Sequence, residues 1–241
     1  MASDSEIADL LHSRRYDPAI LSTLEAYMER QVRGGADAYD AEANAAVLKL
    51  YQLEPDRLQG RTVVLILAKA IMALPSIDLL SCVYLLAPAQ AAEASTAASY
   101  IGDDGPIRGV LALAERLEAG HFAQFWEELE RERADGTALG KLLAEVVDFE
   151  QCVRRFMVGA LGRTWSRMSP SVLKALTRDD ACPHGWRMVT DADEQTVLET
   201  PVGSVLSQQP RAAGERLSFE RLAPVLCRVG RESARARPRR R

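Results

Sequence analysis

Few side chains in this sequence are of the types that perform catalysis or hold a metal ion. The only histidines are His12, His121 and His184, and none lies in a zinc-binding spacing such as H-E-x-x-H. The nearest approach to a thiol–imidazole pair is Cys182 followed by His184, but a structural zinc site usually has four ligands. A bend in a loop explains this segment better. We therefore expect no catalytic residue, no bound metal and no cofactor.

Motifs of nucleotide binding and acyl transfer are also missing. The sequence contains no G-x-S-x-G, no G-x-x-x-x-G-K-[ST] and no G-x-G-x-x-G. The four cysteines, Cys82, Cys152, Cys182 and Cys227, lie far apart and form no C-x-x-C, which favours reduced thiols over a disulfide framework. These observations predict a protein that is not an enzyme and takes no small-molecule substrate.

Basic residues concentrate at the C-terminal end of the chain. Residues 228–241 hold seven Arg and one Glu, a net charge of +6. The formal net charge of the whole chain is −4, so residues 1–227 have a net charge of −10. One interpretation is a solvated, disordered tail. The other is contact with RNA phosphates through Arg235, Arg237, Arg239, Arg240 and Arg241. The tail has no aromatic side chains that could stack on bases, so such binding would be indifferent to sequence and sensitive to salt.

The elements around these residues are predicted to be mostly helices. Apolar stripes recur at helical spacing through the first half of the chain and are separated by Gly, Pro and Asp punctuation. We expect helices over residues 7–11, 18–32, 40–51, 58–74, 76–87, 89–99, 107–119 and 121–133. Short turns between helices of ten to seventeen residues indicate stacked antiparallel hairpins. No apolar run approaches the ~20 residues of a membrane span, so we expect no membrane association.

The second half is predicted to be different in kind. Leu139–Leu161 keeps one apolar stripe and predicts a single long helix, and Ser169-Pro170 starts a short one. Trp186–Val189 and Thr196–Glu199 flank a polar turn and predict a β-hairpin, before a closing helix over 218–226. Helix, short helix and hairpin outline a winged-helix module. The predicted fold is therefore mainly α, with a helical domain over 1–135, a winged-helix domain over 136–227 and a basic tail over 228–241.

Several segments resemble a known family. Tyr39–Pro55 reads Y-D-A-E-A-N-A-A-V-L-K-L-Y-Q-L-E-P and follows Tyr16-Asp17-Pro18 at a fixed distance. His121–Trp126 reads H-F-A-Q-F-W, and Phe149–Phe156 reads F-E-Q-C-V-R-R-F. In this order the segments resemble subunit K of eukaryotic translation initiation factor 3, collinearly from about residue 14 to residue 226.

The resemblance implies a non-catalytic subunit without a cofactor. It implies HEAT-like helical repeats followed by a winged helix, as in PCI-type subunits, and a cytoplasmic location that allows a nuclear pool. The implied partners are the other subunits of the factor, chiefly subunit L, and through the complex the small ribosomal subunit. Equivalent small subunits of the proteasome lid and the signalosome share this architecture and remain the alternative. Between Leu176 and Trp186 the chain is short by roughly two helical turns relative to the family.

The predicted hairpin is a candidate protein interface. In proteins of this architecture the hairpin adds to a sheet shared with neighbouring subunits, which is a mode of edge pairing. The candidates are Met188, Val189, Val197 and Leu198. The alternative is that these side chains pack on the helices of their own domain, and both interpretations stay open at this level.

Overall fold

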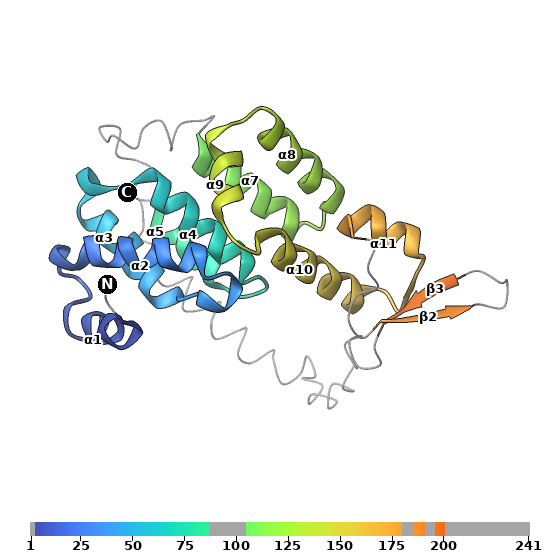
Figure 1. The fold of residues 1–241 in the computed structure, drawn as a ribbon, viewed down its shortest axis with the longest axis horizontal. Coiled ribbons are helices and arrows are strands. Elements are labelled where there is room, and N and C mark those ends of the chain that lie inside the picture. The colour runs from blue at the N-terminus through green and yellow to red at the C-terminus, as the bar shows by residue number, and fades with distance from the viewer. Residues whose placement is uncertain (1–2, 87–104, 180–185, 191–195, 201–241) are drawn as a thin grey trace, which may run out of the picture. The chain divides into compact units, whose positions relative to one another are not determined.

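The structure is a computed structural model that describes residues 3–86, 105–179, 186–190 and 196–200. These residues form a mainly helical fold with one small antiparallel sheet (Figure 1), as predicted in outline. They all belong to one compact unit of the chain. The predicted domain boundary at residues 135 and 136 stays a prediction.

The helices follow one another with short connections. In the first half they are α1 Asp4–Arg14, α2 Leu21–Arg33, α3 Ala41–Leu53, α4 Gly60–Met72, α5 Asp78–Leu86, α7 Pro106–Glu118 and α8 Phe122–Ala134. The second half contains α9 Ala138–Glu145, α10 Phe149–Thr164 and α11 Pro170–Thr177. Single 3₁₀ turns at Pro18–Ile20, Ala36–Ala38 and Pro55–Arg57 lie between the early helices.

Most predicted helix ends are confirmed. The Asp40 carboxylate accepts a hydrogen bond from the Ala43 N–H at 3.0 Å and caps α3, and Glu54 before Pro55 ends that helix. Ser169 caps α11 by accepting from the Val172 N–H. Gly35, at φ +67°, follows the end of α2, a backbone conformation that glycine adopts without steric cost.

The helices pack around a continuous apolar core, and some of the closest pairs, α3 with α5 and α4 with α7, are not consecutive. Helix α4 is its centre: every residue from Thr62 to Ile71 is buried, and α4 contacts α2, α5, α7, α9 and α10. The Lys69 side chain is 1% exposed and donates a hydrogen bond to the Gly35 carbonyl. That bond satisfies the buried ammonium and ties α4 to the end of α2.

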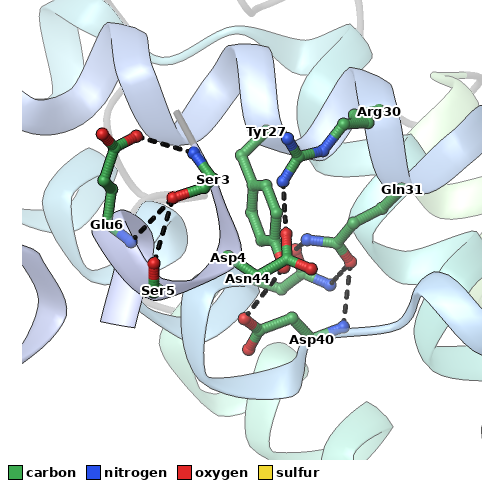
Figure 2. Close-up of polar contacts among 9 residues, drawn as sticks. All are labelled: Ser3, Asp4, Ser5, Glu6, Tyr27, Arg30, Gln31, Asp40 and Asn44. Atoms are coloured by element: carbon green, nitrogen blue, oxygen red, sulfur yellow. Dashed lines mark hydrogen bonds and ion pairs between the residues drawn. The ribbon is translucent and has the colours of Figure 1, made fainter. Parts of the chain in front are cut away.

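A polar cluster joins the starts of α1 and α3 to α2 (Figure 2). Gln31 and Asn44 are almost fully buried, and their amides exchange hydrogen bonds of 3.0 and 3.1 Å. Gln31 also accepts from the Asp40 N–H, and Tyr27 donates to the Asp40 carboxylate. Arg30 donates to Asp4. Each buried amide is therefore satisfied, which fixes the register between α2 and α3.

The prediction of one long helix over Leu139–Leu161 is wrong. The chain forms α9 and α10, with a break at residues 146–148 where Asp148 takes φ +62°. The Val147 N–H leaves the helical pattern and donates to the Val32 carbonyl of α2 at 3.2 Å. Val146 and Phe149, on either side, are both buried, so the apolar spacing conceals the break.

The predicted hairpin is confirmed, and one further strand accompanies it. Strand β2 (Arg187–Thr190) pairs with β3 (Thr196–Glu199), and β1 (Arg167–Met168) pairs with the other side of β3, giving the order β1-β3-β2. Strand β1 was not predicted, because two residues carry no readable pattern. The helices expected at 89–99 and 218–226, the shortened segment around 180–185 and the tail arginines lie outside the described residues.

Candidate protein-interaction surface

Strand β2 is an outer strand of the sheet, and one of its edges faces away from β3. The Thr200 N–H donates to the Ser166 carbonyl beside β1, so the backbone groups of Leu198, two residues earlier, face β1 as well. The groups of Val197 then face β2 and pair with Val189. By the same alternation, the N–H and C=O of Met188 point outward from β2. The sequence predicted the hairpin but could not tell which backbone groups remain unpaired.

The four predicted interface residues have different environments. Leu198 is 2% exposed and packs in the core with Met168, its neighbour across the sheet. Met188 faces the same side but lies on the outer strand and is 67% exposed. Val189 and Val197 pair on the opposite face and are half-buried. Of the four side chains, Met188 is therefore the one left most accessible to another protein.

Helix α11 positions the sheet, and two side chains hold α11. The Trp126 indole N–H of α8 donates to the Leu176 carbonyl at 2.9 Å. Arg154 of α10 stacks over the Trp126 ring at 5.0 Å and donates to the Thr177 carbonyl. These bonds satisfy carbonyls at the end of α11, which have no partners within the helix. The helices of the first half are thereby connected to the element on which β3 packs.

Two ion pairs of Glu150 form a second link between α8 and α10. Glu150 of α10 pairs with Arg133 of α8 and, at 2.7 Å, with Arg154. Burial alone raises the pKa of the Glu150 carboxyl, but the hydrogen bonds and charges of Arg133 and Arg154 outweigh it and leave that pKa below its usual value. Glu150 is thus ionised at neutral pH and orients the arginine that covers Trp126.

The described residues offer neither a metal-binding cluster nor an exposed thiol. No group of three or more His, Cys, Asp or Glu side chains there could hold a metal ion. Cys82 and Cys152 are free and buried, and burial raises the pKa of the Cys82 thiol to about 11. A thiol with so high a pKa is not a nucleophile at neutral pH. Burial also lowers the pKa of Lys69. Among these residues, no helix is long and apolar enough to cross a bilayer.

Comparison with known proteins identifies the family. A model of the CSN8/PSMD8/EIF3K family matches residues 57–196. Eukaryotic translation initiation factor 3 subunit K of Homo sapiens and of Mus musculus are each 36% identical over 220 residues, covering 88% of this chain and 89% of the relative. The Danio rerio protein of the same name is 30% identical over the same length. The chain therefore belongs to the CSN8/PSMD8/EIF3K family and, within it, to the proteins named subunit K of eukaryotic translation initiation factor 3.

Proposed function

We propose that this chain is a non-catalytic structural subunit of eukaryotic translation initiation factor 3. The observation that carries this proposal is the 36% identity to the human subunit K over 88% of the chain. Its role would be to contribute protein–protein contacts to the assembly that binds the small ribosomal subunit during initiation. In the described part of the chain the buried polar side chains have hydrogen-bond partners and the helices share one core, as a rigid scaffold requires.

The proposal includes a finer description of the fold. Helices that pack in series, both on neighbours such as α7 and α8 and one helix apart such as α3 and α5, support a HEAT-like domain over residues 1–135. The order α10, β1, α11, β2, β3 supports a winged-helix domain over 136–227. Between Leu176 and Trp186 the chain is short relative to the family it resembles, at the place where a DNA-binding winged helix has its recognition helix. This shortness favours a role in protein contacts.

The proposed partners follow the family. Subunit L is the chief candidate, and the small ribosomal subunit is reached through the complex. The outward edge of β2 around Met188 is the proposed contact, since an unpaired strand edge can add a strand from a neighbour. The tail arginines, Arg235 to Arg241, are proposed to contact RNA. The expected location is the cytoplasm, where initiation takes place, with a nuclear pool allowed.

Affinity purification of the tagged full chain from its own cells, followed by mass spectrometry, tests this function. We expect the other subunits of initiation factor 3, and small ribosomal subunits in the same gradient fractions. Enrichment of proteasome-lid or signalosome subunits would reject the proposal in favour of the equivalent subunit of those complexes. A chain that migrates only as a free monomer would reject both.

A further inference from the structure

A pocket of about 530 Å³ lies where α1 begins and α2 connects to α3. Cavities that bind ligands typically measure ~300–1,000 Å³, so this pocket has room for a side chain of another molecule. Its charged lining residues are Asp4, Arg30, Asp37 and Asp40, which are three carboxylates against one guanidinium. We call it the α2–α3 pocket.

The walls of the α2–α3 pocket already hold one guanidinium group (Figure 2). Arg30 lies over the Tyr27 ring, with its guanidinium carbon 4.7 Å from the ring centre, and it donates to the Asp4 carboxylate. Asp4 thus balances the charge of Arg30. Asp37 and Asp40 form no ion pair with any basic side chain of the described residues. Two carboxylates of the pocket are therefore left without a cation from this part of the chain.

The tyrosine hydroxyls of the pocket add further acceptors. Tyr27 donates its O–H to Asp40 at 3.3 Å, and Tyr39 donates its O–H to Asp78 at 3.2 Å. Burial and the charges of these carboxylates raise the pKa of both tyrosines, so both hydroxyls stay protonated and keep these bonds. A hydroxyl that donates its proton still has lone pairs that can accept a bond from a ligand.

The lining therefore calls for a cation that donates several hydrogen bonds. A metal ion is a poor match, because no group of three or more His, Cys, Asp or Glu among the described residues could hold one. Gln31, the one amide in the lining, is 2% exposed and bonded to Asn44, so it offers little to a ligand. Carboxylates that do not converge suit a guanidinium, whose five N–H donors are spread over a planar fork.

We propose that the α2–α3 pocket binds an arginine side chain of a partner protein. The pocket supplies acceptors on several sides, and its own Arg30 shows that a guanidinium packs on these walls. The surrounding chain also attracts a basic partner, because described residues 3–148 hold 13 Lys or Arg against 21 Asp or Glu. This inference goes beyond the proposed function: it concerns the first helices and not the edge of β2, and it does not depend on which complex contains the chain.

Two tripeptides test the inference: acetyl-Gly-Arg-Gly-amide and its citrulline counterpart, which has the same shape without the charge. Each is titrated into the ¹⁵N-labelled full chain, and backbone amide signals are followed by two-dimensional NMR. We expect the arginine peptide to shift the signals of Ala38, Tyr39 and Ala41, and the citrulline peptide to leave them in place. Asp37→Asn should weaken binding by roughly threefold, the scale of one exposed ion pair. In every sample five tail arginines are replaced by Ala, so that the tail cannot compete: Arg235, Arg237, Arg239, Arg240 and Arg241.

Asp37→Lys places a like charge in the pocket and should abolish the shifts. Asp135→Lys is the matched control, because Asp135 is an exposed aspartate at the end of α8 and does not line the pocket. Circular dichroism shows whether each variant keeps the fold, and Asp37→Asn remains as the test if Asp37→Lys does not fold.

The inference is overturned if the citrulline peptide causes equal shifts, or if the shifts survive unchanged in both Asp37 variants. It is also overturned if Asp135→Lys removes the shifts, because binding would then reflect the overall charge. Spermidine provides the last comparison. If spermidine shifts the same signals at a lower concentration than the arginine peptide, the pocket is a polyamine site and not a contact for a protein.

Discussion

At the scale of single residues, the contacts around Trp126 connect α8 and α10 to the end of α11. Trp126, Arg154 and Glu150 form one chain of contacts from α8 through α10 to the end of α11. Arg154 serves two purposes, because it covers the indole and donates to a helix-terminal carbonyl. Loss of the charge on Glu150 should therefore be felt beyond the ion pair itself.

Glu150→Gln should lower the free energy of unfolding by about 1 kcal/mol at pH 7, since two partly exposed ion pairs are lost. The folded-state pKa of Glu150 is depressed, so its contribution is present above the unfolded pKa and is lost as pH falls through the folded value. Urea unfolding of both proteins at pH 7 and pH 3.5 measures this. Glu127→Gln, which removes an exposed carboxylate from helix α8, is the control. An equal difference at both pH values would contradict the electrostatic origin.

At the scale of elements, the turn after α2 and the break before α10 depend on each other. Gly35 has φ +67° and ψ −156°, a region that is essentially reserved for glycine. A Cβ at Gly35 would lie 2.4 Å from the Asp148 carboxylate, and Asp148 is itself the residue with positive φ in the break. The Gly35 carbonyl also accepts the hydrogen bond of buried Lys69.

Gly35→Ala should therefore destabilise the fold by about 2 kcal/mol, from backbone strain and from the displaced carboxylate together. Gly136→Ala is the matched control, because Gly136 also has positive φ but has no atom within 4 Å of an added Cβ. We expect that control to cost about 1 kcal/mol. Thermal unfolding of the two variants gives the comparison, and equal losses would show that the contact with Asp148 is unimportant.

The strand edge can be tested at the same scale. Met188→Pro removes an outward N–H from β2 and should reduce incorporation into the initiation factor severalfold without unfolding the chain, because proline is tolerated on edge strands. Val197→Pro is the contrasting variant, since Val197 pairs inward with Val189 and its loss breaks the hairpin itself. Quantitative pull-down with circular dichroism separates the two. Normal incorporation of Met188→Pro would exclude this edge as the contact.

Most helices could be predicted from the sequence because their ends are marked locally. Asp40, Gly34 and Pro55 signal ends of helices through capping, backbone freedom and steric exclusion. The break at Asp148 could not be predicted, because it is stabilised by a bond from Val147 to distant Val32 while the apolar spacing continues. The interface residues were predicted from their place in the hairpin, and burial separates Leu198 from Met188 only once α11 and β1 are in place.

At the scale of the whole molecule, charge is unevenly distributed along the chain. The seven arginines of residues 228–241 follow a body with a net charge of −10. An even distribution of the same net charge of −4 would attract RNA less, because attraction to phosphates depends on the local density of positive charge.

Replacement of Arg235, Arg237, Arg239, Arg240 and Arg241 by Ala should weaken binding of the full chain to any RNA by a similar factor, whatever its sequence. The effect should be largest at low salt and should fade by 0.5 M, because it arises from counterion release. Filter binding over a salt series measures it. Replacement of the same number of exposed arginines in the described part of the chain is the control, and an affinity unchanged by the tail variant would leave the tail as a solvated extension.

The sheet order β1-β3-β2 also determines when the outer edge of β2 forms during synthesis. Strand β1 ends at Met168, which pairs with Leu198, so this pairing closes a loop of about thirty residues. Each helix before it forms from residues that are near neighbours in sequence. On the ribosome, the helices of the first half can therefore fold long before the sheet does. A neighbouring subunit that adds a strand at β2 can recognise only a chain that has been synthesised beyond β3. Assembly through this edge would thus exclude fragments that end before β3.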